Sequence, residues 1–174
     1  TNDRTSSASI FINDGNAQFS LHKVLPTSDR PGFARIFDVN LDGVPEIGVT
    51  SIFRTFQRPL DLFYANGDLG YGQTRIQDLA HRPFDMITLD LNADTYPDVI
   101  QSSSGNVLSV FLSDTNGGVV FDRDYIIGES PRIEQPIDLN GDGILDIVTS
   151  NQSGLTTVSV LLGTNTGTLV QFDE

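Results

Sequence analysis

Short apolar runs alternate with turn-forming residues along the whole chain. "SIFINDGNAQFSL", "DLFYANGDLGYGQ", "SVFLSDTNGGVVF" and "SVLLGTNTGTLVQF" each join an apolar run to a second β-prone run through Asn, Asp and Gly. This order of residues predicts β-hairpins. Runs such as "SVLL" are apolar at consecutive positions, so we expect both faces of those strands to be covered. No capped stretch with a period of 3.6 residues reaches helical length, which predicts almost no helix.

A second, acidic pattern recurs three times. "DVNLDGVPE", "DLNADTYPD" and "DLNGDGILD" begin at Asp38, Asp90 and Asp138, and apolar residues flank all three at matching positions. A proline lies seven residues before each of these aspartates, at Pro31, Pro83 and Pro131. Each copy thus reads as a strand, an acidic loop, a strand and then a hairpin. Repeats of this length with four strands are typical of β-propeller blades.

We therefore predict an all-β chain of β-propeller-type blades, each with four antiparallel strands. The 174 residues form a single repeat array. Its parts are a partial blade (1–29, the leading hairpin) and three full repeats (30–79, 80–127 and 128–174). About 14 strands are too few for even a four-bladed ring of 16. The chain also begins without Met, so we expect a piece of a longer array, or a chain that meets another edge to edge.

Proline at position 136 falls in the strand expected before the third acidic loop. Proline is tolerated only at sheet edges, and the innermost strand of a blade is an edge that faces the central channel. We expect Pro136 in such a strand. The alternative is that the residues around Pro136 are irregular.

The acidic loops present oxygen atoms at alternate positions, as a hard cation with six or more ligands requires. Side chains at positions 1, 3, 5 and 9 and the carbonyl at position 7 form the expected set. The ligands are Asp38, Asn40, Asp42, Val44 and Glu46; Asp90, Asn92, Asp94, Tyr96 and Asp98; and Asp138, Asn140, Asp142, Ile144 and Asp146. Gly43 and Gly143 at position 6 permit the sharp turn. We predict about three Ca²⁺ ions, since magnesium keeps more water and zinc prefers His and Cys, which the loops lack. The alternative is a set of Asx-turns without metal.

Composition narrows the function classes. The chain has 23 acidic and 10 basic residues, a formal charge of −13, and no cysteine. A surface of this charge disfavours nucleic acid as a partner. No apolar run is long enough to span a membrane. Only His22 and His81 could serve as imidazole bases, and no nucleophile recurs near either, so we predict that the chain is not an enzyme.

The three acidic loops and their flanking strands resemble the FG-GAP/VCBS repeats of integrin α-subunit propellers and of many secreted proteins. "DVNLDGVPEIGV", "DLNADTYPDVI" and "DLNGDGILDIV" carry the resemblance, with "GFARIF" at 32–37 as a partial match to the Phe-Gly element. The resemblance implies an extracellular or cell-surface propeller with calcium as a structural ion. It also implies that exposed loops bind a protein or glycan ligand, as in cell adhesion.

Several alternatives remain open at this level. A glycan-binding lectin could use aromatic platforms, although packing between blades also explains these residues: Phe56, Tyr64, Tyr71 and Tyr125. A surface filament could form by self-association through open blade edges. Asn151 begins the one N-glycosylation sequon. Among the metal sites we expect occupancy to fall in the order third, first, second, because Glu46 is longer than Asp and Thr95 replaces glycine.

Overall fold

A computed structural model covers the chain and describes residues 1–2, 4–28, 30–52, 59–66, 70–78, 81–153 and 157–172. The side chains of 59 and 73–78 are not described. These residues form strands, turns and loops and contain no helix, which confirms the all-β prediction. All strand pairs are antiparallel.

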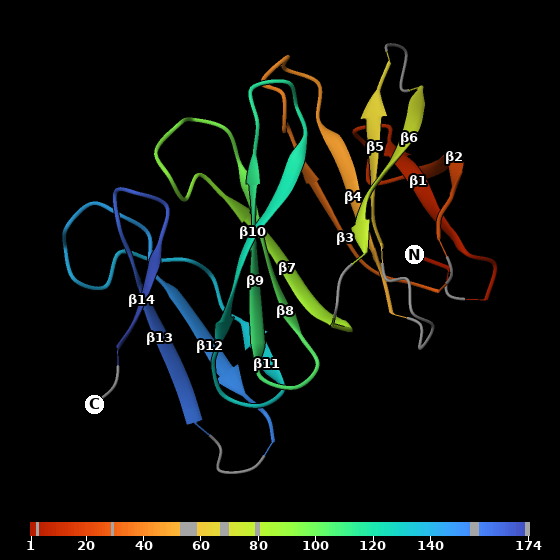
Figure 1. Ribbon diagram of the computed structural model, residues 1–174. Coiled ribbons are helices and arrows are strands. Elements are labelled where there is room, and N and C mark those ends of the chain that lie inside the picture. Colours follow the sequence, from red (N-terminus) through yellow and green to blue (C-terminus); the bar gives the residue numbers. More distant parts are fainter. Residues whose placement is uncertain are drawn as a thin grey trace.

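The described strands form one hairpin and three four-stranded sheets (Figure 1). The leading hairpin contains β1 (Ser7–Asn13) and β2 (Phe19–Pro26). The first sheet contains β3 (Pro31–Phe37), β4 (Glu46–Ser51), β5 (Pro59–Ala65) and β6 (Tyr71–Asp78). The middle sheet contains β7 (Pro83–Leu89), β8 (Asp98–Ser103), β9 (Val107–Ser113) and β10 (Val119–Ile126). The last sheet contains β11 (Pro131–Ile133), β12 (Ile147–Asn151), β13 (Thr157–Gly163) and β14 (Leu169–Phe172).

Each four-stranded sheet is a meander whose strands pair in chain order. The turns after β8, β9 and β13 are short and contain a left-handed glycine (Gly105, Gly117 and Gly167), so the strands that they join become neighbours. The tip between β9 and β10 shows this, since Asp114 N–H donates to the carbonyl of Gly118 at 2.8 Å and Gly117 has a φ of 78°.

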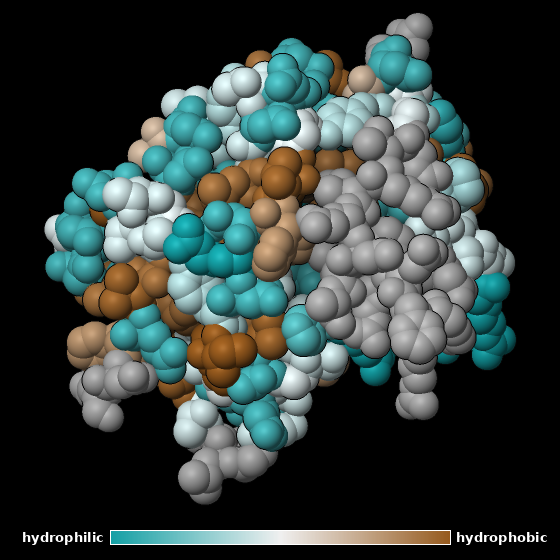
Figure 2. Space-filling model, viewed as in Figure 1, coloured by the Kyte–Doolittle hydropathy of each residue, from teal (hydrophilic) through white to brown (hydrophobic). Residues whose placement is uncertain are grey.

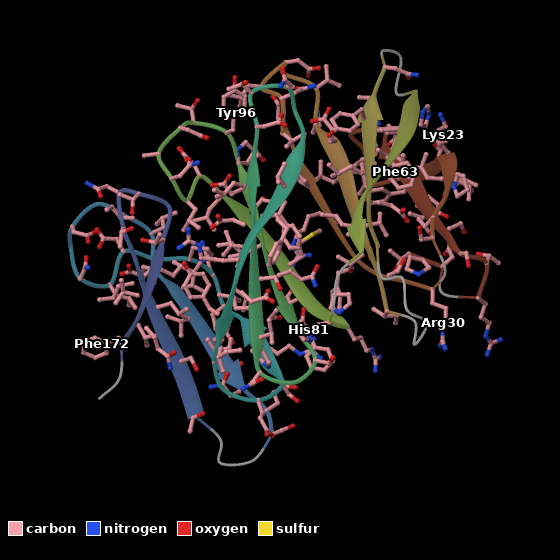
Figure 3. All side chains as sticks on the ribbon, viewed as in Figure 1. Lys23, Arg30, Phe63, His81, Tyr96 and Phe172 are labelled. Atoms are coloured by element: carbon pink, nitrogen blue, oxygen red, sulfur yellow. The ribbon has the colours of Figure 1, made fainter. Side chains whose placement is uncertain are left out.

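The hairpin and the sheets stack face to face in chain order, with one hydrophobic cluster in each gap. Between the hairpin and the first sheet lie Ala8, Leu25, Ile47, Val49 and Phe63. Between the first and middle sheets lie Phe37, Val39, Leu60, Leu62, Met86, Val99, Phe111 and Val119. Between the middle and last sheets lie Leu89, Leu91, Ile100, Leu108, Val110, Ile127, Ile133, Ile147, Leu161 and Leu169. Figure 3 shows Phe63 inside the first of these gaps.

Strand β8 explains why apolar residues occur at consecutive positions. Adjacent side chains of a strand point to opposite faces, so Val99 packs toward the first sheet and Ile100 toward the last. All six residues of β8 are buried. Its polar residues Gln101, Ser102 and Ser103 are buried as well, so the position of β8 between two sheets covers both of its faces, as the sequence predicts for strands with consecutive apolar residues.

The first strands of the three sheets lie beside one another, β3 next to β7 and β7 next to β11. Arg35 of β3 forms an ion pair with Asp85 of β7 at 2.9 Å. Arg132 of β11 donates to the carbonyl oxygen of Phe84 in β7 and lies 4.8 Å from the centroid of the Phe84 ring. The described part of the chain makes an open succession of sheets, with no closed ring.

One expectation about the last sheet is wrong, and a second holds only in part. Strand β11 ends at Ile133, so Pro136 lies in irregular chain and only an isolated bridge pairs Ile137 with Asp146. Proline has no N–H for the ladder, and the strand stops before it. Strand β13 is fully covered on one face only: within the run "SVLL", Leu161 is buried and Val160 and Leu162 are half-buried, and Val158, just before the run, is 63% exposed.

Candidate metal-binding loops

The three acidic loops occupy the same place in their sheets, between the first strand and the second. Figure 1 shows them as large loops, orange, green and blue, at the same end of successive sheets. No Lys, Arg or His occurs within any of them, so each loop collects carboxylates without a basic side chain of its own.

The aspartate at position 1 organises each loop by accepting backbone N–H groups. In the first loop, Asp38 Oδ1 accepts from Asp42 N–H at 3.1 Å and Oδ2 accepts from Gly43 N–H at 2.9 Å. Asp90 accepts from Asp94 and Thr95 at the same distances. The position-1 side chain therefore faces the inside of the loop in both copies.

Positions 3 and 5 also turn inward. Asn140 Oδ1 accepts from Asp142 N–H at 2.9 Å, and Asp142 Oδ1 accepts from Ile144 N–H at 2.8 Å. Asn140 Nδ2 donates to Asp142 Oδ2 at 2.9 Å. The first and second loops repeat these three bonds at equivalent residues. The structure thus brings together the predicted side chains at positions 1, 3 and 5 in all three loops.

The backbone is left-handed at two positions of each loop. Position 6 was expected to need glycine, and its φ is 84° at Gly43, 78° at Thr95 and 87° at Gly143. Position 4 is left-handed as well, at Leu41, Ala93 and Gly141. Only the third loop has glycine at both positions, so it has the least backbone strain.

The position-9 acid is buried at the start of the second strand and binds backbone amides. Asp146 Oδ2 accepts from Leu139 N–H at 2.8 Å, and Oδ1 accepts from Gly163 N–H at 2.8 Å. Asp98 does the same with Leu91 and Ser113 at 2.9 and 2.8 Å. These acids connect their loop to the third strand of the sheet, a role that spacing along the sequence did not reveal.

Glu46 differs from the other two position-9 acids. Its Oε2 accepts from Val39 N–H at 2.9 Å, but its Oε1 is buried and has no hydrogen-bond partner. Burial raises the pKa of Glu46, and the negative charges of Asp42 and Asp38 raise it further. A buried oxygen without a donor is costly unless a cation or a proton compensates it.

The pKa values distinguish the buried acid at position 9 from the exposed acid at position 1. Burial raises the pKa of Asp98 to about 6, with a smaller contribution from the charges of Asp94 and Asp90. The pKa of Asp138 is lowered, chiefly by the N–H group of Gly143. The Asp138 carboxylate therefore remains charged at neutral pH, and in the second loop the charges of Asp94 and Asp90 oppose ionisation of Asp98.

As placed, the loops do not form a complete acidic cage. Among the described residues, no group of three or more His, Cys, Asp or Glu side chains converges tightly enough to hold a metal ion. The donors that do converge are the carboxylates at positions 1 and 5 and the amide at position 3. These are hard oxygen ligands, which suit calcium chemically.

The next sheet covers the first two loops. A Cβ atom added to Gly117, at the β9–β10 tip, would lie 2.9 Å from the Cβ of Asn40. One added to Gly167, at the β13–β14 tip, would lie 2.6 Å from the Cβ of Asn92. The turns "NGG" and "NTG" carry this signal in the sequence, but it could be read only as turn chemistry.

The aromatic residues considered as glycan platforms pack between sheets. Tyr64 packs on the cluster between the first and middle sheets and donates to the carbonyl oxygen of Gly117. Tyr71 and Tyr125 pack on the clusters on either side of it. Phe56 lies outside the described residues.

Asn151 is unsuited to glycosylation in the folded chain. It is only 4% exposed, and its Nδ2 donates to Thr157 and Ser159 at 3.0 Å each. A glycan on Nδ2 would have no room there.

Comparison of the chain with protein-family models, with curated proteins and with solved structures finds no match. Among the described residues there is no helix long and apolar enough to cross a membrane.

Proposed function

We propose that the chain is a non-catalytic, calcium-stabilised module of the β-propeller type that binds a protein or glycan ligand through its exposed loops outside the cell. The observation that carries the proposal is the threefold acidic loop. Each copy has Asp, Asn and Asp at positions 1, 3 and 5, the same inward hydrogen bonds and the same place in its sheet.

The buried acid at position 9 supports a cation in this part of the fold. The unpartnered Oε1 of Glu46 lies in a loop that also contains Asp38 and Asp42. A calcium ion beside these carboxylates would offset their mutual repulsion and would be coordinated by the orphaned oxygen. In this proposal the ion stabilises the loop and takes no part in catalysis.

The stacking of the sheets supports the propeller-type arrangement. Strands β3, β7 and β11 lie side by side, as the innermost strands of successive blades do. The loops that connect them to the next strands emerge at one end of the stack, where a ligand can reach them.

Calcium-dependent stability tests this proposal. We expect millimolar calcium to raise the melting temperature relative to chelator, and more strongly than magnesium does. A ligand that binds only the folded state adds about 2.7 kcal/mol when its concentration is 100 times its dissociation constant.

A pair of matched variants then ranks the sites. Asp142 and Asp94 accept equivalent hydrogen bonds, so replacing either with alanine removes the same local contacts. Asp142→Ala should remove more of the calcium-dependent stabilisation than Asp94→Ala, since the third loop has the less strained backbone. Glu129→Ala, at an exposed acid outside the loops, controls for the change in net charge.

Equal losses for the two aspartate variants would contradict the ranking of the sites. A parent chain that melts at one temperature in calcium and in chelator would contradict the calcium proposal. Screening the chain for binding to a glycan array and, separately, to a panel of extracellular proteins would distinguish the two ligand classes.

A further inference from the structure

Two apolar sheet faces are uncovered in the described structure, one at each end of the stack. The outward face of the last sheet, here called the accepting face, contains the exposed residues Ile137, Leu139 and Val158 and the half-buried residues Val148, Val160 and Leu162. The outward face of the leading hairpin, here called the docking face, contains Phe11, Phe19, Leu21 and Val24. Figure 2 shows hydrophobic atoms at the surface on the side of β13 and β14, and Figure 3 shows Phe172 pointing away from the body there.

The accepting face repeats a face that is buried in the earlier sheets. The register pairs Ile47 with Phe63, and Ile147 with Leu161, which aligns β5 with β13. On this alignment Leu60 corresponds to Val158, yet Leu60 is 1% exposed and Val158 is 63% exposed.

Position 2 of the acidic loops, directly after the first aspartate, also changes from buried in the first two copies to exposed in the third. Val39 and Leu91 are 0% and 2% exposed, because the middle and the last sheet cover them. Leu139 is the equivalent residue of the third loop, and it is 50% exposed. The accepting face is thus the surface on which a following sheet packs.

The docking face is equivalent to the face of the middle sheet that packs against the first sheet. The β1–β2 tip closes with Asp14 N–H donating to the carbonyl of Gln18 at 3.0 Å, as the β9–β10 tip does between Asp114 and Gly118. Aligning these tips matches Phe11 with Phe111 and Phe19 with Val119. Phe111 and Val119 are 2% and 4% exposed, buried against the first sheet, whereas Phe11 and Phe19 are 54% and 66% exposed.

From these two equivalences we propose that the chain associates head to tail with a second copy, the docking face of one copy covering the accepting face of another. The contact would reproduce the packing that already occurs between successive sheets of one chain. Its two sides are different surfaces, so the association is heterologous and produces a closed ring or an open filament. The contact is between faces and does not require pairing of edge strands.

Charge favours the hairpin as the partner surface. The chain carries a formal charge of −13, whereas the partial blade 1–29 has two basic residues (Arg4 and Lys23) and three acidic ones (Asp3, Asp14 and Asp29), a formal charge of −1. The rest of the chain bears the repulsion between copies, which salt screens. Association should therefore strengthen as ionic strength rises.

Ala17, at the β1–β2 tip, limits how closely the hairpin can approach the other copy. Ala17 has a φ of 60° and occupies the place of Gly117, which lies against Asn40. In the proposed contact, Ala17 would lie against Asn140 of the other copy, and its methyl group would hold the tip slightly outward. Ala17→Gly should therefore tighten the association.

Sedimentation velocity and light scattering across a concentration series test the proposal on the 174-residue chain. The accepting-face variant is Val158→Asp, and the docking-face variant is Phe11→Asp with Phe19→Asp. All three positions are exposed, so circular dichroism should show an unchanged fold. Val120→Asp is the matched control, because Val120 is 57% exposed even though the last sheet follows it.

We expect the parent and the control to associate with rising concentration, and each face variant alone to do so at least about tenfold more weakly. An equimolar mixture of the two face variants should form a dimer, since each retains the surface that the other lacks. A mixture that stays monomeric overturns the proposal. A parent chain that stays monomeric at every concentration also overturns the proposal, and it would assign these faces to another partner. A control variant that loses association as the face variants do overturns it as well.

Discussion

The left-handed residues of the acidic loops set how much strain each loop carries. A residue with a Cβ in this conformation costs about 1–2 kcal/mol, and a β-branched side chain is among the least tolerated. The second loop has Ala93 and Thr95 at its two left-handed positions, whereas the third has Gly141 and Gly143. The loops are alike in ligands and unlike in backbone cost.

Replacing Thr95 with glycine should stabilise the chain by about 0.5–1 kcal/mol, the relief of strain less the greater flexibility of glycine in the unfolded state. Urea denaturation at fixed calcium measures this change. Thr88→Gly, in the extended strand β7, is the matched control and should destabilise the chain. A loss of stability in Thr95→Gly would show that the threonine side chain contributes more than its backbone strain removes.

At the scale of elements, hairpin tips and acidic loops fit together across neighbouring sheets. The tip of β13–β14 lies against the second acidic loop, and Tyr125 Oη of the middle sheet accepts from Leu169 N–H at 2.8 Å beside it. The tip approaches closely because Gly167 has no side chain. Packing between sheets thus extends beyond their apolar faces to the acidic loops.

Gly167→Ala should destabilise the chain by more than Gly105→Ala. Both glycines are left-handed, with φ values of 73° and 87°, so both variants incur a conformational cost of about 1–2 kcal/mol. A Cβ on Gly105 would meet nothing within 4 Å, whereas one on Gly167 would lie 2.6 Å from Asn92 Cβ. The clash should add about 1–3 kcal/mol, the usual cost of overpacking, as measured by urea denaturation. Equal costs would mean that the tip and loop separate freely.

At the scale of the whole molecule, the chain is a succession of sheets and differs from a domain built around one central core. The first and middle sheets are covered on both faces, while the leading hairpin and the last sheet are each covered on one. Burial of apolar surface on both sides makes local opening of the inner strands costly.

Hydrogen exchange should reflect this order. We expect the slowest amides in β8 and β9, and faster exchange in β1, β2 and β14. The measurement belongs on the accepting-face variant, in which association between copies cannot protect the ends. Uniform protection across all the sheets would show that the chain opens only as a single cooperative unit.

Most of the fold follows from local chemistry that the sequence displays. The hairpins were predicted from "NDG", "TNG" and "TNTG" turns between apolar runs, and the structure contains each of these hairpins. The left-handed backbone at Thr95 was anticipated because glycine occupies that position in the other two loops. The left-handed position 4 was not, since Leu41 and Ala93 are residues that rarely adopt it.

The sequence by itself determined the all-β class, the hairpins and the acidic loops, because turns and alternating side chains depend on residues that are near neighbours in the chain. Only the tertiary structure decided which strand faces are covered, that β11 stops before Pro136, and that Asp98 and Asp146 bind amides of a distant strand. These features depend on contacts between residues far apart in the chain. Strand β13 shows the difference: the sequence places apolar residues on both of its faces, but the packing of the sheets buries Leu161 on one face and leaves Val158 63% exposed on the other.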